Sequence, residues 1–301
     1  TDSQASNALY SSGLKIYSTQ SPSIQKALDE EFANEENFPS NVKVGIEWAM
    51  TVVKPNGDTT NYSQEMMISY YKQNDSSYEP LYSSKDDAQA AIDGYVATLG
   101  ITDDDTVYED CSFIMQPQAS MVIMDQTTGE VVAMIGGRGE KTANKTLNRA
   151  SDSLRNPGST FKILAAYAPA LDSCDKTLAT TIDDEPYTLK NGNVLRNANK
   201  QYGGTTTLRN GIKKSINVVA VKLSDEITQE LGYEYCEKFG ISTLVKDKTI
   251  NGKVFDDSTS QTLALGGITE GVYNYEMCAA YASIANGGVY NKPTLYRKVV
   301  D

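Results

Sequence analysis

The feature that most constrains the fold is an apolar run at residues 159–171, STFKILAAYAPAL, which directly follows Pro157 and Gly158. Its length and composition predict a buried helix, and the Pro-Gly pair allows a tight turn into it. Ser159 and Lys162 lie three positions apart in the first turn of that helix. Residues at this spacing share one helix face, so the lysine amine can reach the serine oxygen.

The Ser-x-x-Lys spacing alone identifies nothing, because it occurs at Ser12, Ser23, Ser40, Ser69, Ser159 and Ser173. Only Ser159 begins a strongly apolar helix, where free N–H groups and the positive end of the helix dipole favour a developing oxyanion. Burial against that helix disfavours the ammonium form of Lys162, which would leave a neutral base near pH 7. We therefore predict that Ser159 is a nucleophile and that Lys162 is its base.

The chain contains no histidine. This excludes Ser-His-Asp and Cys-His nucleophile systems and histidine-based metal sites, so acyl transfer must take its base from Lys, Glu, Asp or Tyr. The four cysteines are widely spaced and form no C-x-x-C motif: Cys111, Cys174, Cys236 and Cys278. That spacing argues against a zinc knuckle or a redox motif and leaves pairing and compartment open. No metal or other cofactor is expected.

The net charge is strongly negative, because 27 Lys and Arg residues face 39 Asp and Glu residues, which gives −12. Such a chain has no electrostatic reason to bind nucleic acid, and it has no basic run typical of a membrane-surface patch. It contains no apolar stretch of about 18 residues and no signal-peptide pattern. We expect a soluble fragment that is cut from something larger.

The length of 301 residues predicts roughly two domains, at about 150 residues for each. The first part, residues 1–116, is predicted to be a small, Tyr-rich α+β module without a catalytic constellation, acting as a spacer or pedestal. Its expected elements are a strand at 14–19, a helix at 21–32, an alternating strand at 42–52 and a helix at 84–100.

The second part, residues 117–301, is predicted to start with a hairpin of central, well-buried strands within 119–138. Further expected elements are the helix at 159–171, a pair of helices within 205–232, a helix ending at 286–288 and the beginning of a strand after residue 292. Ser-x-Asn occurs once, at Ser215–Asn217, in a break between the paired helices. Ser and Asn are also common helix caps, so this triplet alone has a plain structural interpretation.

Several segments together resemble the transpeptidase part of class A, bifunctional penicillin-binding proteins. The quoted segments are GLKIYSTQSPSIQKAL, VIMDQTTGEVVAMIGGR, NRASDSLRNPGSTFK, TLRNGIKKSINVVAVKL and LALGGITEGVYNYEMCAAYASIANGG. The similarity covers residues 13–35 and 117–301, whereas residues 41–116 resemble an inserted linker. The resemblance implies an α+β fold, a penicillin-binding or serine β-lactamase-like transpeptidase domain with an antiparallel sheet and helices, preceded by a linker domain.

Two departures from the family pattern are evident. The family's glycosyltransferase domain, membrane anchor and signal are not in the sequence, so no glycan polymerisation is expected. The sequence also contains no Lys-Thr-Gly or Lys-Ser-Gly triplet, which in the family lies on a strand beyond the helix that ends in NGG. We expect a chain truncated before that motif, with the C-terminal strands missing and catalysis impaired.

The resemblance implies a serine D,D-transpeptidase that cross-links peptidoglycan stem peptides through an acyl-enzyme on Ser159 and is inhibited by β-lactams. Lys162 would be the base, Ser215 would relay a proton, and Asn217 would hold the substrate amide and help position Lys162. The parent protein would act on the extracytoplasmic face of a bacterial membrane, anchored through the absent N-terminal segment, with cell-wall synthesis proteins as further partners. Two alternatives stay open: a serine β-lactamase or penicillin sensor, and a non-catalytic scaffold.

Overall fold

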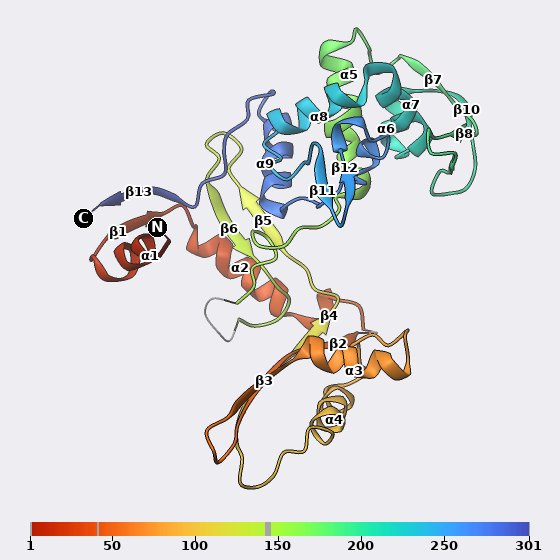
Figure 1. Cartoon of the computed structure of the whole chain (residues 1–301). Coiled ribbons are helices and arrows are strands. Elements are labelled where there is room, and N and C mark those ends of the chain that lie inside the picture. The colour runs from red at the N-terminus through yellow and green to blue at the C-terminus, as the bar shows by residue number, and fades with distance from the viewer. Residues whose placement is uncertain (1, 41, 142–145, 301) are drawn as a thin grey trace. The chain divides into compact units, whose positions relative to one another are not determined.

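The computed structural model describes residues 2–40, 42–141 and 146–300, and the chain forms two compact units (Figure 1). Unit 1 comprises Thr1–Asp29, Ser120–Gly136 and Ala143–Asp301, and unit 2 comprises Glu30–Ala119 and Gly137–Thr142. None of the helices in the described residues combines the length and the apolar character needed to cross a membrane.

Unit 1 combines helices with short antiparallel strand pairs. Its helices are α1 (Asp2–Ser11), the first part of α2 (Pro22–Ala33), α5 (Ala168–Ser173), α6 (Leu208–Lys213), α7 (Asn217–Ile227), α8 (Gln229–Lys238) and α9 (Asn274–Ala285). Its strands are β1 (Lys15–Ser18), β5 (Met121–Met124), β6 (Val131–Ile135), β7 (Thr181–Asp184), β8 (Tyr187–Thr188), β9 (Val194–Leu195), β10 (Gly204–Thr207), β11 (Lys248–Ile250), β12 (Lys253–Phe255) and β13 (Tyr296–Val300). The pairs are β1 with β13, β5 with β6, β7 with β10, β8 with β9 and β11 with β12.

The hairpin predicted within residues 119–138 is confirmed as β5 and β6, which pair from Met121 opposite Ile135. The strands are less buried than predicted: Val131 and Ala133 are buried on β6, but β5 is exposed or half-buried along its whole length. The physical reason is that the sheet holds two strands within the described residues, and α9 packs against β5 (Figure 1).

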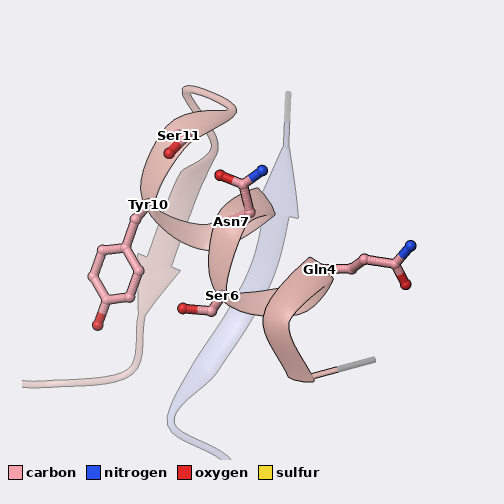
Figure 2. A pocket seen from close by; sticks show the side chains of 5 residues that line it. All are labelled: Gln4, Ser6, Asn7, Tyr10 and Ser11. Carbon is pink, nitrogen blue, oxygen red and sulfur yellow. The ribbon is translucent and has the colours of Figure 1, made fainter.

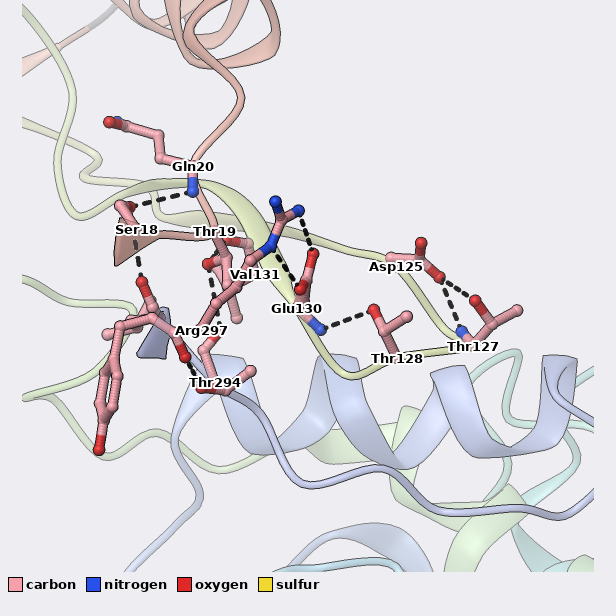
Figure 3. Close-up of polar contacts among 12 residues, drawn as sticks. Ser18, Thr19, Gln20, Asp125, Thr127, Thr128, Glu130, Val131, Thr294 and Arg297 are labelled. Atoms are coloured by element: carbon pink, nitrogen blue, oxygen red, sulfur yellow. Dashed lines mark hydrogen bonds and ion pairs between the residues drawn. The ribbon is translucent and has the colours of Figure 1, made fainter. Parts of the chain in front are cut away.

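The first 29 residues belong to unit 1, whereas the sequence placed all of residues 1–116 in one module. One reason is a long-range contact drawn in Figure 3, in which the Thr19 hydroxyl donates to the Val131 carbonyl oxygen at 2.6 Å. Figure 3 also shows Arg297 of β13, which forms two hydrogen bonds of 2.7 Å with Glu130 beside β6. Strand β1 also pairs with β13 at the other end of the chain. These contacts join separate stretches of the chain and cannot be read from local sequence patterns.

Helix α1 precedes β1 and carries a shallow surface hollow of about 430 Å³ (Figure 2). Five polar or aromatic residues of this one helix line it: Gln4, Ser6, Asn7, Tyr10 and Ser11. Because one helix supplies the whole lining, the hollow is a feature of the helix surface and not a gap between packed elements.

The core of unit 1 is built around the apolar run, which is helical from Gly158 to Ser173 as predicted. One side of the run, at Phe161, Leu164 and Ala165, packs with Tyr233, Cys236 and other residues in one cluster. The other side, at Ala166 and Ala170, packs with α7 and with Leu208 in a second cluster. The single helical run therefore joins the two apolar clusters of the unit.

Unit 2 is a three-stranded antiparallel sheet in the order β3-β2-β4, with two helices against one face. Its elements are the end of α2, β2 (Lys43–Val53), β3 (Thr59–Ser63), α3 (Gln64–Asn74), α4 (Lys85–Val96) and β4 (Thr106–Gln116). The alternating strand and the helix after Ser84 are confirmed, and the alternation of β2 buries Val44, Ile46, Trp48, Met50 and Val52. Its core residues pack with Met67, Ile92 and Tyr95 of the helices.

Candidate active site

Ser159 stands in the first turn of a helical run whose pitch changes along its length. The run starts with the 3-10 turn η2 (Gly158–Thr160), passes through the π turn η3 (Ile163–Tyr167) and ends with α5. Gly158 has a φ of +57°, so the Pro-Gly pair supplies the left-handed residue that the turn requires. Ser159 is exposed, whereas Phe161 two residues later is fully buried. The predicted position of the serine, at the open end of a buried helix, is confirmed.

Two glycines of a later loop lie directly against the backbone in front of Ser159. A Cβ atom on Gly266 would lie 2.4 Å from the carbonyl oxygen of Gly158, and one on Gly271 would lie 2.8 Å from the carbonyl carbon of Arg155. Arg155 and Val272 also exchange two backbone hydrogen bonds, of 3.1 and 2.9 Å. The turn that presents Ser159 is therefore held by backbone-to-backbone packing that leaves no space for side chains at these glycines.

Helix α9 contributes a contact to the same turn. The Tyr281 hydroxyl donates to the Thr160 carbonyl oxygen at 2.6 Å, and the Thr160 hydroxyl donates to the Pro157 carbonyl oxygen at 2.7 Å. A hollow of about 540 Å³ opens beside these residues, and its lining includes Asn156 and Met277 as well. Residues on both sides of Ser159 in the sequence therefore border an open space.

Lys162 is 2% exposed although it carries an amine. Its Nζ donates to the carbonyl oxygen of Ser215 at 2.7 Å, to the hydroxyl of Ser215 at 3.0 Å and to Asn217 Oδ1 at 2.6 Å. A lysine ammonium has three donors, so all three are satisfied, and each acceptor is electrically neutral. The structure thus brings together three of the four residues that the sequence singled out.

The Ser215–Asn217 triplet lies where predicted, in the break between α6 and α7. Ser215 has a φ of +51°, an uncommon value for a residue other than glycine, and such backbone strain is concentrated at functional sites. The side-chain nitrogen of Asn217 donates to the Arg196 carbonyl oxygen at 2.9 Å, which leaves Asn217 Oδ1 directed at Lys162. The break thus presents a carbonyl, a hydroxyl and an amide oxygen to one buried amine.

Burial lowers the pKa of Lys162 from its ordinary value to about 8. The physical cause is desolvation, which penalises the charged ammonium more than the neutral amine. With a pKa of about 8, roughly a tenth of the Lys162 side chains are neutral at pH 7. The direction of the shift agrees with the expectation from the sequence, and the ammonium remains the major form at neutral pH.

The Ser159 side chain forms no hydrogen bond to any residue in the part of the chain that the structure describes, so its expected contact with the Lys162 amine stays a prediction. The other five Ser-x-x-Lys pairs differ clearly, because none of their lysines is buried: Lys15, Lys26, Lys43, Lys72 and Lys176. Burial of the lysine therefore separates the Ser159 pair from the rest.

Sequence patterns did not indicate the loop that holds Asn217. Asn197 Oδ1 accepts hydrogen bonds from the backbone N–H groups of Asn217 and Val218, at 3.0 and 3.2 Å. Asn197 lies in a polar stretch, RNANKQ, without periodicity, and its partners are 20 and 21 residues away. No local signal marks one asparagine of such a stretch.

The structure also bears on metals and disulfides. No group of three or more Cys, Asp and Glu side chains in residues 2–40, 42–141 and 146–300 is arranged to hold a metal ion. The four cysteines are unpaired: Cys111, Cys174, Cys236 and Cys278.

Comparisons with known proteins identify relatives of this chain. Penicillin-binding protein 1A of Clostridium tetani is 36% identical over 226 residues, which cover 73% of this chain and 28% of that protein. Penicillin-binding protein 1A of Clostridium acetobutylicum is 38% identical over 205 residues, which cover 64% of this chain and 24% of that protein. This chain thus spans about a quarter of the length of the curated relatives it matches.

A solved structure shares the fold. The PonA1 protein from Mycobacterium tuberculosis in complex with penicillin V superimposes with a TM-score of 0.59 at 17% identity, covering 100% of this chain and 58% of that one. Residues 119–301 match the family described as penicillin binding protein transpeptidase domain. This matched region contains the buried Lys162, the Ser-x-Asn break and the apolar helix, and the chain belongs to the penicillin-binding protein transpeptidase family.

Proposed function

We propose that this chain is the acyl-transferring part of a serine D,D-transpeptidase, with Ser159 as nucleophile and Lys162 as base. The observation that carries the proposal is the buried Lys162 amine, three residues after an exposed serine on the same helix and in contact with Ser215 and Asn217. A buried amine with neutral partners and a lowered pKa is the kind of group that accepts a proton near neutral pH.

In the proposed reaction the Ser159 hydroxyl oxygen attacks the carbonyl carbon between the two terminal D-alanines of a stem peptide. The hydroxyl proton passes to the neutral Lys162 amine. A neutral amine has two donors and one lone pair, so Lys162 keeps two of its three present contacts and turns the lone pair to Ser159. Ser215, which contacts Lys162 at 3.0 Å, relays this proton from Lys162 to the leaving nitrogen. The bond between the two D-alanines then breaks, and D-alanine departs.

The acyl-enzyme then transfers its acyl group to an amine of a neighbouring stem peptide, which forms the cross-link and restores the Ser159 hydroxyl. The Ser159 backbone N–H, at the start of the helical run, supplies one donor to the oxyanion in both steps. One such donor is worth about 3 kcal/mol in comparable sites. Asn217 holds the amide of the bound peptide and fixes Lys162.

Mass spectrometry after exposure to penicillin tests the nucleophile. We expect one covalent adduct, and peptide mapping should place it on Ser159. Ser159→Ala should abolish the adduct, whereas Ser173→Ala, a change in another Ser-x-x-Lys pair, should leave it intact. An adduct on Ser173 or Ser215 would overturn the assignment.

Persistence of the adduct separates the transpeptidase from a serine β-lactamase. We expect the acyl-enzyme to last for minutes or longer, because a transpeptidase active site excludes water as an acceptor. The names of the relatives, penicillin-binding protein 1A, support the transpeptidase. Rapid release of hydrolysed penicillin would favour the β-lactamase, and no adduct at all would favour the scaffold interpretation.

Stem peptides and β-lactams are the ligands in this proposal, and stem peptides place the reaction outside the cytoplasmic membrane. We also propose that residues 1–301 are acylated slowly, because they contain no Lys-Thr-Gly or Lys-Ser-Gly triplet. The adduct assay tests it: the labelling rate of residues 1–301 is compared with that of a longer chain that carries the triplet. Equal rates would contradict this part of the proposal alone.

A further inference from the structure

The N-terminus of α7 carries Asn217, but the residue at the N-cap position just before it cannot cap the helix. This residue, Ile216, has an apolar side chain and makes no side-chain capping bond. The first N–H groups of a helix have no partners within the helix and need acceptors from elsewhere. Asn197 supplies one from an earlier loop, because its Oδ1 accepts from the N–H groups of Asn217 and Val218.

The orientation of Asn197 is fixed by acceptors on its other side. Its Nδ2 donates to Asp184 Oδ1 at 2.7 Å and to the Gln201 carbonyl oxygen at 2.9 Å. Asp184 Oδ2 in turn accepts from the Gly203 N–H at 2.9 Å. Asn197 is 7% exposed and Asp184 is 4% exposed, so both groups depend on these partners. Two acceptors at Nδ2 require Oδ1 to face α7.

The residue before Asn197 holds the side chain of Asn217. The Arg196 carbonyl oxygen accepts from Asn217 Nδ2, which directs Asn217 Oδ1 to the Lys162 amine. Two adjacent residues therefore hold Asn217 twice: Asn197 binds its backbone and Arg196 binds its side chain. A change at Asn197 releases the first contact directly and loosens the second, because the two contacts come from one short loop.

We propose that Asn197, itself held by Asp184, is a positioning residue that sets the place of Asn217 against Lys162. The inference rests on the proposed function for its catalytic meaning. Within the described residues Asn197 forms no hydrogen bond to Lys162 or Ser159, and it acts through Asn217. Displacement of a catalytic group by about 1 Å costs on the order of 10²-fold in rate.

Asn197→Ala tests the proposal, with Asn199→Ala as a matched control in the same loop. Asn199 is exposed, and its side chain accepts a bond from the Gln201 N–H within the loop. We expect Asn197→Ala to reduce the rate of labelling by a fluorescent penicillin by about 10- to 100-fold. Asn199→Ala should label at the wild-type rate. Equal rates for wild type and Asn197→Ala would overturn the proposal.

A second readout does not depend on labelling. In the described residues the contacts of Lys162 Nζ are the three neutral oxygens of Ser215 and Asn217, and the carboxylate of this network, Asp184, lies behind Asn197. Loss of the Asn217 oxygen removes a partner of the ammonium while burial remains. An NMR titration of the Lys162 side chain should therefore show a lower pKa in Asn197→Ala. An unchanged titration of Lys162 in Asn197→Ala would overturn the positioning proposal. Failure of the wild-type chain to label would instead refute the proposed function, and the titration would still test the positioning proposal in that case.

A double variant that exchanges Asp184 and Asn197 tests the proposal if Asn197→Ala fails to fold. Asp184→Asn combined with Asn197→Asp keeps one carboxylate and one amide, so the helix N-terminus and the Gly203 N–H keep acceptors, while the Gln201 carbonyl oxygen loses its donor. In this double variant the carboxylate stands at residue 197 instead of residue 184, and it is therefore nearer to Lys162. The NMR titration should show a raised pKa of Lys162, whereas Asn197→Ala should lower that pKa. Labelling at pH 9 should recover to within about threefold of wild type, a change of at most about 0.65 kcal/mol. A folded exchanged pair with a wild-type titration and poor labelling would refute the positioning role.

Discussion

Unit 1 and unit 2 carry very different charge. Unit 2 contains six Lys and Arg residues and 18 Asp and Glu residues, so its net charge of −12 equals that of the whole chain. Unit 1 contains 21 residues of each sign and is neutral overall. The net negative charge of the chain therefore lies in unit 2, and the residues proposed for catalysis lie in unit 1, which is neutral overall.

The units also satisfy their buried charges differently. In unit 2 the Asp105 and Arg138 side chains, each 1% exposed, form ion pairs with Lys54 and Glu35. In unit 1 the buried Lys162 has three neutral acceptors and forms no ion pair with any residue that the structure describes. Only the first arrangement places opposite charges in contact, and it leaves Arg138 Nε and Nη1 without a hydrogen-bond partner in the described residues.

This difference determines which buried groups can exchange a proton. The hydrogen bond from Lys54 lowers the pKa of Asp105, so that carboxylate stays charged over a wide pH range. Burial without an opposite charge lowers the pKa of Lys162 to about 8, near neutral pH. A neutral set of partners thus keeps a buried amine available as a base, whereas an ion pair fixes the protonation state.

The largest expected effect comes from removing the amine. Lys162→Ala should reduce the rate of acylation by penicillin by about 10²- to 10⁴-fold, because the chain has no histidine to replace the base. The measurement is the labelling rate, with circular dichroism to show that the fold is kept. Lys54→Ala, which removes the lysine of the unit 2 ion pair, should label like wild type. Wild-type labelling by Lys162→Ala would exclude it as the base.

The pH dependence of labelling should follow the Lys162 amine. A base must be neutral to accept a proton, and a group with a pKa of about 8 is mostly charged below that pH. The labelling rate should therefore rise by about tenfold per pH unit between pH 6 and 7.5 and level off above pH 9. A rate independent of pH over this range would show that Lys162 is not the group that takes the proton.

Two glycines allow a matched test of backbone packing in the two units. Gly266→Ala in unit 1 should destabilise its unit by about 3 kcal/mol, since the new Cβ would meet the Gly158 backbone at a φ of +73°. Gly57 in unit 2 has a φ of +91°, but a Cβ added there would meet open space. Gly57→Ala should therefore destabilise unit 2 by only about 1–2 kcal/mol. Residue-resolved hydrogen exchange measures both. Labelling should fall for Gly266→Ala alone, and equal destabilisation at both sites would refute the packing argument.

The smallest expected effect is at the surface of unit 2. Tyr108 and Asp110 are exposed on β4, so Tyr108→Ala and Asp110→Asn should leave the labelling rate within about twofold of wild type. The same assay measures this. A folded variant of either residue that no longer labels would show that unit 2 contributes to acylation, and the contrast between the units would then have to be withdrawn.

The sequence predicted elements whose signal is local. The apolar run at 159–171, the alternating strand that became β2 and the break between two helices near Ser215 each follow from spacing and residue type. The burial of Lys162 could also be anticipated, because the apolar residues around it leave the helix few exposed positions. The candidate residues Ser159, Lys162, Ser215 and Asn217 were therefore accessible without coordinates.

The rest depends on contacts between distant parts of the chain. Strand β4 carries acidic residues that weaken a strand pattern, and it forms because β2 pairs with it along 11 residues. Asn197 could not be identified, because its partners in α7 are 20 and 21 residues away and its loop is uniformly polar. Tertiary pairing determines both cases, and single-sequence patterns do not contain it.

The π turn η3 has a consequence for chain length. A π turn holds one residue more than an α-helical turn, so it shifts the rotational phase between Lys162 on one side and Ala168 on the other. If Ile163–Tyr167 became α-helical with all five residues kept, Ser159 and Lys162 would rotate by about 100° about the helix axis, and Lys162 would face away from the Ser-x-Asn break. Deleting one residue from the turn at the same time would restore the phase, because an α-helical turn with one residue fewer covers the same rotation. The register of this helix is thus fixed by the number of residues in the turn as well as by their identity.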